Sequence, residues 1–430
     1  MATVSIIVTT YNVEQYIEEC LASVAAQTLH DIEVLVVDDG STDSTPSLIR
    51  EFAARDSRFV PVLLEQNSPG GVATAANAGL DRATGDWIGF VDGDDFVEPD
   101  MFESLVNAAS LGNADLAMCK YLEVDETSGQ RNEPADAHRW ATLEDPVYPL
   151  DVVNRQMFLR FIAVPWRKLY RRDLLEDNKI RFPEGDYFFE DNPFHWFAIL
   201  SAKAIAIVPK ALAYHRVARA GQTMATADER LFRIFMHHDT IHRWLVEREL
   251  LGIYQVPLLT WVISQLEWIS RRTPQELRGQ LYAAVRPIFA QYDVGTVIRA
   301  LNEGNKGEKT RRLSLALAKG DQSGFSKGLE GRPDTNNLLL VGWHHLRYSG
   351  VRRTAQITGR YAKQQVDKSD ALGRVTRVRG RHTVSNADLM FALATLQQQL
   401  DEMQERLAQL EQSPEGSFSR SAAPESADPR

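Results

Sequence analysis

Two short acidic runs follow hydrophobic segments in the first hundred residues. Asp38 and Asp39 come directly after residues 34–37 (VLVV), and the run 92–95 (DGDD) follows residues 87–91 (WIGFV). Carboxylates at one site repel each other and any bare phosphate, and a divalent cation removes this conflict. Oxygen ligands suit Mg²⁺ or Mn²⁺, which bind through carboxylates together with substrate phosphates. The pattern predicts a metal-bound nucleotide diphosphate, whose departure the metal stabilises.

Individual roles follow for side chains near these runs. We predict that these acidic runs bind the metal, and Asp92 can accept hydrogen bonds from ribose hydroxyls. Asp39 can accept a hydrogen bond from a base N–H, and Tyr11 offers a flat surface for the base. The competing interpretation is that these acids are solvated turn residues, because Asp and Gly favour turns. Two such clusters in one β-α register favour the functional interpretation.

A third acidic pair, Glu190-Asp191, lies among aromatic residues in the segment 188–194 (FFEDNPF). An acceptor hydroxyl is a weak nucleophile at neutral pH, so its transfer chemistry needs a base near the reacting carbon. Partial desolvation among aromatic rings raises the pKa of a carboxyl group toward neutrality. We predict Asp191 as this base, with Glu190 beside it. The alternative is that the dipole of a helix starting near Pro193 favours acids there.

The elements that must position these side chains alternate between strand and helix. Buried apolar runs predict strands at residues 4–8, 34–37, 59–64, 87–91 and 115–119. Amphipathic spacing predicts helices at about 13–27 and 72–82, one that Ser44 and Pro46 open, and another from Pro99. Asn12 is expected to cap the first helix. The alternation predicts an α/β fold, a doubly wound, mostly parallel, Rossmann-like sheet with helices on both faces. Ligands of such sheets bind outside the carboxyl ends of the strands.

The remaining chain divides by composition. We expect a catalytic domain at 1–226, with late strands at 204–208 and 212–214, and a helical domain with a linker at 227–337, of which 302–337 is the polar, irregular part. A basic segment at 338–382, a coiled coil at 383–412 and a disordered tail at 413–430 follow. No dinucleotide fingerprint or phosphate-binding loop follows the first strand.

The last hundred residues carry two further patterns. Apolar side chains from Leu389 to Leu410 alternate at spacings of four and three, a heptad seam that predicts a homo-oligomer, dimer or trimer, against the alternative of one helix packed on its own domain. Between Arg347 and Arg381 there are ten Lys and Arg and two Asp. This segment either contacts an anionic membrane or phosphate-rich polymer, or is a solvated basic face. Its few aromatic residues argue against nucleic acid.

Composition bounds the location of the protein. The net charge is −10, and the two cysteines, Cys20 and Cys119, are expected to be small core residues in a reducing compartment. The first residues lack a signal-peptide pattern, and residues 253–263 are too short and too polar to span a bilayer. We expect a soluble, cytoplasmic protein, or one attached peripherally to the inner face of the membrane.

Three segments in order resemble the family 2 glycosyltransferases of the GT-A fold. They are residues 4–12 (VSIIVTTYN), 37–43 (VDDGSTD) and 90–95 (FVDGDD), and the resemblance continues through 166–170 (WRKLY), 180–185 (IRFPEG) and Glu190-Asp191. It covers about residues 1–225. One departure is Ala76, which stands where the family usually has an arginine before Asn77.

The resemblance implies an inverting, one-step displacement at the anomeric carbon, with Asp191 as the base. It implies that Asp39 reads the base, usually uracil, and that Asp92 and Asp94 bind ribose and metal. His215 is carried over as a further metal ligand. The other donor-site residues that we carry over are Thr9, Asn77, Lys168 and Arg216, although a strand-end basic pair is as often structural and Lys168 could be an ordinary surface lysine.

The chain is further similar to bacterial enzymes that build or decorate cell-surface polymers, such as wall teichoic-acid and capsule sugar transferases. This implies a UDP-sugar donor and a glycan or polyol-phosphate acceptor. A related nucleotidyltransferase is an alternative, but the Gly- and Arg-rich loop expected after the first strand is absent. A scaffold with a degenerate sugar-nucleotide fold is another, against which the intact Asp92, Asp94 and Asp191 argue. UDP titration with and without Mn²⁺ separates these, because a scaffold should show no metal-dependent binding.

Overall fold

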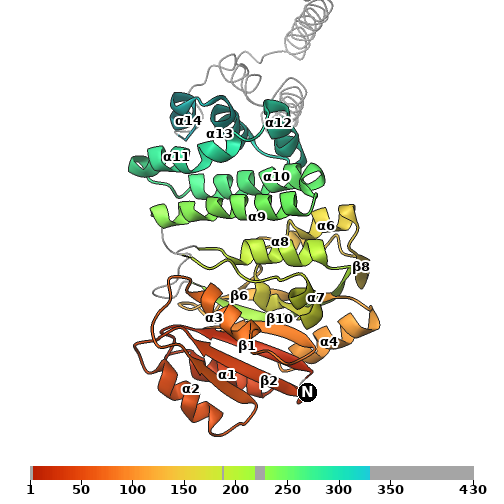
Figure 1. Ribbon diagram of the computed structural model, residues 1–430. Coiled ribbons are helices and arrows are strands. Elements are labelled where there is room, and N and C mark those ends of the chain that lie inside the picture. Colours follow the sequence, from red (N-terminus) through yellow and green to blue (C-terminus); the bar gives the residue numbers. More distant parts are fainter. Residues whose placement is uncertain (1–2, 186–187, 218–227, 330–430) are drawn as a thin grey trace, which may run out of the picture. The chain divides into compact units, whose positions relative to one another are not determined.

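A computed structural model describes residues 3–185, 188–217 and 228–329 of the 430-residue chain (Figure 1). Within these residues ten strands form one sheet in the order β3-β2-β1-β4-β9-β6-β10-β5, with β7 beside β6 and β8 beside β10. The strands are β1 Val4–Thr10, β2 Ile32–Asp38, β3 Phe59–Leu63, β4 Trp87–Asp92, β5 Phe96–Val97, β6 Leu116–Asp125, β7 Arg131–Asn132, β8 Val147–Pro149, β9 Lys168–Arg171 and β10 Ala204–Val217.

Helices alternate with these strands and then continue alone. Those of the sheet domain are α1 Ile17–Ala25, α2 Thr45–Ala53, α3 Val72–Leu80, α4 Met101–Leu111, α5 Ala137–Trp140, α6 Val152–Phe158, the 3-10 turn η1 Pro165–Arg167, α7 Arg172–Asp177 and α8 Asp191–Ser201. The helical domain comprises η3 Glu229–Phe235, α9 Met236–Glu247, α10 Leu251–Ser270, η4 Gln275–Leu277, α11 Arg278–Phe289, α12 Val294–Glu303, α13 Glu308–Lys319 and α14 Gln322–Leu329.

The centre of the sheet is parallel. β1 pairs in parallel with β2 and β4, β2 with β3, and β6 with β10. Every residue of β1 is buried, which fits its unbroken apolar and β-branched sequence, because a strand covered on both faces excludes water from both. β9 lies between β4 and β6 and is antiparallel to both. The predicted α/β fold with a mostly parallel sheet is therefore confirmed.

The loop after β1 differs from the prediction. Asn12 does not cap α1, which begins only at Ile17. Asn12 has a left-handed φ of +50°, and its side-chain oxygen accepts a hydrogen bond from the backbone N–H of Thr42 at 2.8 Å. Asparagine tolerates this conformation better than most residues. The side chain therefore ties the loop after β1 to the loop after β2, a long-range partner that local spacing does not reveal.

Two other expectations need correction. The segments at 204–208 and 212–214 belong to one strand, β10, which shifts register against β6 between Val208 and Ala213. The irregular linker expected at 302–337 is wrong for most of its first part, because α13 and α14 form there. Those glycines of this segment that the structure describes lie at helix ends or within the short α14, where packing outweighs their low helix propensity.

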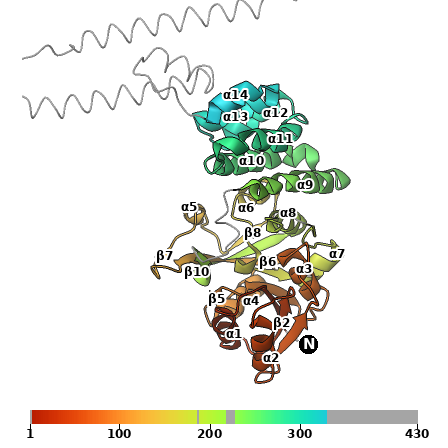
Figure 2. The ribbon, with the colours of Figure 1, turned by 90° about the vertical axis from the view of Figure 1, so that its left-hand side faces the viewer.

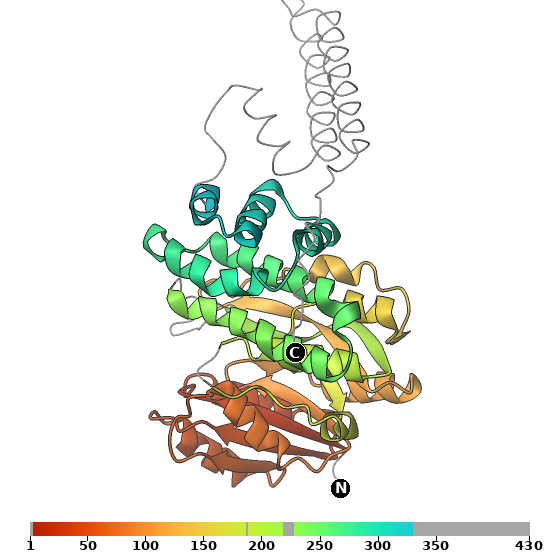
Figure 3. The same ribbon diagram turned by 45° about the horizontal axis from the view of Figure 1, so that its top comes forward.

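Two hydrophobic cores lie within residues 1–354. One surrounds the sheet and takes in side chains from α9 and the start of α10, such as Ile241, Leu245 and Tyr254. The other lies among η3 and α10–α14 and includes Leu259, Ile263 and Leu313. Figure 2 labels the members of this helical bundle, and Figure 3 shows them, coloured green to blue, packed against one another. Helix α10 therefore contributes to both cores, whereas α9 contributes to the first.

Several expectations fall outside the described residues. The basic segment at 338–382, the coiled coil at 383–412 and the tail at 413–430 all do, so they stay predictions, as do the domain boundaries. Among the described residues, no helix combines the length and apolar character needed to cross a bilayer. Cys20 and Cys119 are both buried free thiols, as expected for core residues.

Candidate active site

The sheet register brings the two acidic runs to one edge. β1 lies between β2 and β4, so Thr10 is opposite Asp38 and Thr9 is opposite Asp92. The Thr9 hydroxyl donates to Asp92 Oδ1 at 3.1 Å, and the Thr10 hydroxyl donates to Asp38 Oδ1 at 3.1 Å. The acids therefore lie where three neighbouring parallel strands end, which is the edge that binds ligands in sheets of this kind.

The two acids after β2 have different partners. Asp38 accepts hydrogen bonds from the backbone N–H and the hydroxyl of Ser41, at 2.9 and 2.5 Å, and so holds its own turn. Asp39 accepts from the Asn67 side-chain amide at 2.9 Å and from the Ser68 N–H at 3.2 Å. Burial raises the pKa of Asp39, and the bonds from Ser68 oppose that rise. Asp38 is structural, whereas base reading by Asp39 stays a prediction.

The second run forms a compact cluster of three carboxylates. One oxygen from each of Asp92, Asp94 and Asp95 lies within 4.8 Å of the others. Burial, reinforced by the charges of Asp95 and Asp94, raises the pKa of Asp92 to about 7. Asp95 was not among the predicted site residues, although it was visible as the last acid of the run. An all-oxygen set of this kind fits Mn²⁺ or Mg²⁺, whose charge would offset the repulsion.

His215 lies against this cluster but faces Asp95. Its Nδ1 is 2.9 Å from Asp95 Oδ2, and its ring stacks on Trp166 at 5.3 Å. Burial lowers the pKa of His215, but the charge and hydrogen bond of Asp95 outweigh it and raise the pKa to about 9. An imidazolium has no lone pair for a metal. His215 is therefore placed as a counter-charge to the acids, and metal ligation by it stays a prediction that requires loss of a proton.

Arg216 braces the loop of the second run. Its Nε donates to the Asp94 carbonyl oxygen at 2.8 Å, and its backbone N–H donates to Asp95 Oδ1 at 2.9 Å. The same guanidinium pairs with Glu19 at 2.6 Å and Glu126 at 3.5 Å. The backbone bond and the guanidinium together restrain the direction in which the carboxylates of this loop point. Direct contact of Arg216 with a donor stays a prediction.

The third acidic pair opens α8, with Asp191 as the first residue of the helix. Burial raises the pKa of Asp191 to about 6, and the Lys168 ammonium opposes the rise. Burial raises the pKa of Glu190 further, to about 8, and the charge of Asp92 adds to it, so this pair is within electrostatic reach of the metal cluster. Asn192, which we did not predict, donates from Nδ2 to Asp191 Oδ1 at 2.9 Å.

Lys168 is buried, which corrects the alternative of a surface lysine. Its ammonium donates to the carbonyl oxygens of Ala163 and Val164 at 3.1 and 2.6 Å. Its neighbour Arg167 is also buried and forms a 2.7 Å ion pair with Asp136. Burial followed by the Arg167 charge lowers the pKa of Lys168 well below its usual value. The buried Lys168 ammonium lowers the cost of keeping Asp191 ionised.

Of the remaining predicted residues, Tyr11 is exposed and Asn77 is buried. Tyr11 is 46% exposed, so its ring is open to a ligand. Asn77 is buried, and its side-chain amide donates to the Phe182 carbonyl and to Glu184 Oε1 at 2.9 and 2.8 Å. These hydrogen bonds attach Asn77 to the segment after α7. Direct donor binding by Asn77 stays a prediction. The neighbouring Ala76 is buried as well.

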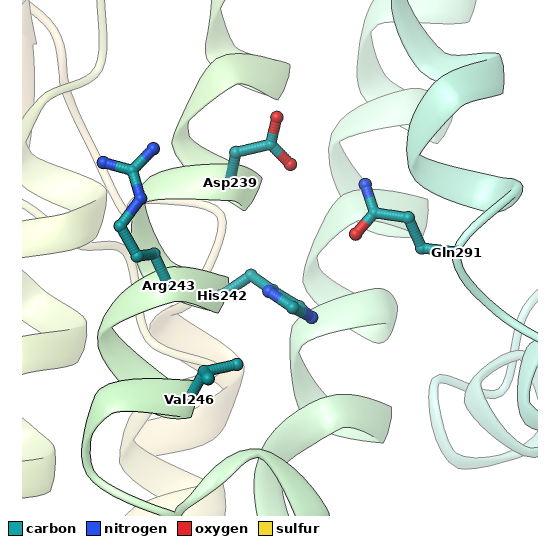
Figure 4. A pocket seen from close by; sticks show the side chains of 5 residues that line it. All are labelled: Asp239, His242, Arg243, Val246 and Gln291. Atoms are coloured by element: carbon teal, nitrogen blue, oxygen red, sulfur yellow. The ribbon is translucent and has the colours of Figure 1, made fainter.

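A separate hollow lies in the helical domain (Figure 4). It is lined by Asp239, His242, Arg243 and Val246 of α9 and by Gln291, which follows α11. All but His242 are exposed, so water screens their charges. None of these residues belongs to the acidic clusters, and the sequence predicted none of them. The chemistry is therefore assigned to the sheet edge.

Comparison with known proteins identifies the family of the chain. Residues 5–178 match the model of Glycosyl transferase family 2. EpsJ of Bacillus subtilis is 36% identical over 216 residues, which cover 50% of this chain and 60% of EpsJ. EpsH of the same organism is 30% identical over 301 residues, which cover 67% of this chain and 85% of EpsH. The chain belongs to glycosyltransferase family 2.

A further family 2 relative is the poly(ribitol-phosphate) β-N-acetylglucosaminyltransferase TarS of Staphylococcus aureus, 30% identical over 229 residues that cover 53% of this chain and 38% of TarS. The crystal structure of TarS residues 1–349 with UDP-GlcNAc superimposes with a TM-score of 0.63 at 25% identity, covering 77% of this chain and 91% of that one. The similarity to TarS therefore extends from the sheet domain into the helical domain, because the superposition reaches beyond the family match at residues 5–178.

Proposed function

We propose that this chain transfers a sugar, with inversion, from a UDP-sugar to a hydroxyl of a cell-surface glycan or polyol-phosphate polymer. The observation that carries this proposal is that two acidic sites lie within electrostatic reach of each other. Three carboxylates suited to a metal lie together, and Asp191 lies beside Glu190, which feels the charge of Asp92. A metal-bound leaving group and a base are the two parts that such a displacement needs.

Glu190 and Asp191 are assigned different roles because their pKa values differ. At pH 7 Asp191, with a pKa of about 6, is mostly ionised and can accept a proton. Glu190, with a pKa of about 8, mostly keeps its own. Adjacent carboxyls pushed apart in this way are typical of acid-base assignments in enzymes. We therefore assign the base to Asp191 and a neutral, supporting role to Glu190.

The reaction step follows from these assignments. The acceptor oxygen bonds to the anomeric carbon while the bond from that carbon to the UDP oxygen breaks. The acceptor proton passes to Asp191, and because Oδ1 already accepts from Asn192, we assign the proton to Oδ2. UDP departs with the electron pair of the broken bond. Mn²⁺ or Mg²⁺ held by Asp92, Asp94 and Asp95 would supply positive charge for that diphosphate.

The donor and acceptor classes rest on similarity and on the residues at the edge. The TarS structure holds UDP-GlcNAc, and TarS is named for transfer to poly(ribitol-phosphate). In this chain Tyr11 is open to stack on a base, and Asp39 offers a carboxylate for a base N–H. Thr9 and Asn77 fix their neighbours Asp92 and Glu184, so we assign them to support of the donor site.

The test is a screen of nucleotide sugars for metal-dependent hydrolysis and transfer to polyol-phosphate and glycan acceptors. We expect turnover with at least one UDP-sugar that requires Mn²⁺ or Mg²⁺ and stops on chelation. UDP should bind more weakly without metal. Binding of UDP that ignores metal, with no turnover of any donor, would favour the scaffold alternative.

The pH dependence of turnover provides a separate prediction. The active form of Asp191 is the carboxylate, and its pKa is raised to about 6. We therefore expect kcat to rise tenfold per pH unit below about pH 6 and to level off above it. Steady-state rates at saturating donor and acceptor, measured from about pH 4.5 to about pH 8, check this limb. A flat profile through pH 6 would remove Asp191 from the rate-determining step.

We infer roles for the C-terminal segments from their sequence alone. The heptad seam at 389–410 would join two or three chains, and the basic segment would contact an anionic membrane or the polymer. Sedimentation with anionic vesicles at low and high salt tests the second role. If the protein binds neither vesicles nor polymer at low salt, the role proposed for the basic segment is wrong.

A further inference from the structure

The loop that leads into α8 is held from the helical domain. Nε2 of His237 on α9 lies 2.7 Å from the Phe188 carbonyl oxygen, and the Phe189 ring meets Trp268 of α10 edge to face at 5.9 Å. Phe189 has a φ of +68°, which is unfavourable for a residue with a Cβ. Such a conformation persists where the surroundings impose it. The helical domain therefore shapes the backbone that carries the acidic pair.

A chain of hydrogen bonds continues from α10 to the proposed base. Nε1 of Trp261 donates to Asn192 Oδ1 at 3.0 Å, and Asn192 Nδ2 donates to Asp191 Oδ1 and to the Phe189 carbonyl, each at 2.9 Å. An indole N–H is a donor only, so it pairs with the oxygen end of the Asn192 amide. The Phe189 carbonyl accepts from the nitrogen end. Hydrogen bonds therefore fix both ends of the amide, so that its nitrogen faces Asp191 Oδ1 and the Phe189 carbonyl.

We infer that Trp261 is a positioning residue for the reaction: it orients Asn192 so that a donor stays on Oδ1 of Asp191 and Oδ2 is left for the acceptor proton. The inference rests on the proposed role of Asp191 as base. It makes the helical domain a part of the catalytic apparatus, although Trp261 lies 69 residues beyond Asn192 in the sequence.

The groups around Asp191 determine how these hydrogen bonds can be detected by titration of its carboxyl group. Titratable groups within reach of it are Lys168 and Tyr170 on β9, Tyr121 on β6 and its neighbour Glu190. All four belong to the sheet domain. From the helical domain, burial lowers the pKa of His237 to about 4, so that side chain is neutral over the working range. The helical domain therefore reaches this loop through a neutral imidazole and an indole N–H, and through the Arg230 guanidinium of η3, which lies over the Phe188 ring at 5.9 Å.

The test compares Trp261→Phe with Trp268→Phe in the full-length protein. Both replace an indole on α10 by a phenyl ring, but only the first removes the donor to Asn192. The Asp191 carboxyl is titrated by ¹³C NMR, its signal identified by its absence in Asp191→Asn. A donor to the carboxylate favours its charged form, so its loss raises the pKa. We expect Trp261→Phe to raise the titration midpoint by about 0.5 to 1 pH unit and Trp268→Phe, which keeps an aromatic ring to face Phe189, to leave it in place.

Kinetics provide a second readout. In Trp261→Phe the acidic limb of kcat should move up by the same amount, while KM for the donor stays as in the wild type. In an Asn192→Ala background, Trp261→Phe should add nothing, because the two residues act in one chain. Asn192→Ala leaves α10 intact, and it should give the same shift even if Trp261→Phe does not fold.

The outcomes separate this inference from the proposed function. An unshifted Asp191 midpoint in Trp261→Phe and Asn192→Ala overturns the inference, even when the wild type transfers sugar. A wild type that turns over no nucleotide sugar contradicts the proposed function, and the NMR titration still decides whether Trp261 acts on Asp191. Equal shifts in Trp261→Phe and Trp268→Phe would point to general loosening of α10 and would also overturn it.

Discussion

Replacing Asp191 by asparagine is expected to lower kcat for sugar transfer by about 10²- to 10⁴-fold, the usual contribution of a general base. Asparagine keeps the size of the side chain but cannot accept the acceptor proton as a carboxylate does. UDP affinity should stay as in the wild type, because the proposed diphosphate site lies at Asp92, Asp94 and Asp95. Single-turnover rates and calorimetric UDP titrations measure the two effects separately.

Glu190→Gln is the matched control for this prediction. At pH 7 Glu190, with a pKa of about 8, is mostly protonated, so a neutral glutamine resembles its working form. We expect a much smaller loss of kcat than in Asp191→Asn. Should the two variants lose activity equally, the division of roles between the adjacent acids is wrong. Undiminished turnover in Asp191→Asn would remove the assigned base altogether.

Replacing Asp94 and Asp95 together by asparagine is expected to weaken metal-dependent UDP binding by about 100-fold or more, since even outer-shell partners of metal sites are worth about 10- to 100-fold. Each of these acids contributes an oxygen to the three-carboxylate cluster. The amides keep the shape of the loop but carry no charge to hold Mn²⁺ or Mg²⁺. Titration of UDP with Mn²⁺, and again after chelation, measures the loss.

Thermal stability distinguishes this effect from unfolding. Without metal, neutralising two of three carboxylates relieves their mutual repulsion. This gain in stability should offset the loss of the hydrogen bonds that Asp95 accepts from His215 and Arg216. We therefore expect the Tm of the metal-free variant to stay close to that of the wild type. Asp100→Asn removes an acid from an exposed pair with Lys210 and should change neither property. Wild-type affinity for UDP and Mn²⁺ in the double variant would contradict the assignment of the cluster.

Much of the site could be predicted because its residues are contiguous in sequence. Each acidic run directly follows a buried strand, and parallel strands end at one edge, so strand recognition alone places Asp38 and Asp92 on either side of the end of β1. The same local reasoning found the acidic pair before α8. It overlooked Asp95 because a run of acids does not show which of its members turns inward. It also misjudged Asn12, whose partner lies on another loop.

The amino-acid sequence by itself determined the strand and helix alternation and the chemistry of the sheet edge, since hydrophobic periodicity and short acidic motifs are local properties of a chain. Only the tertiary structure decided which groups meet across long separations: His215 with Asp95, Lys168 buried behind Asp191, and Trp261 with Asn192. Burial and hydrogen-bond geometry, which set the pKa values of the acids, arise when distant segments pack together. They divide the roles of two adjacent carboxyls that look alike in the sequence.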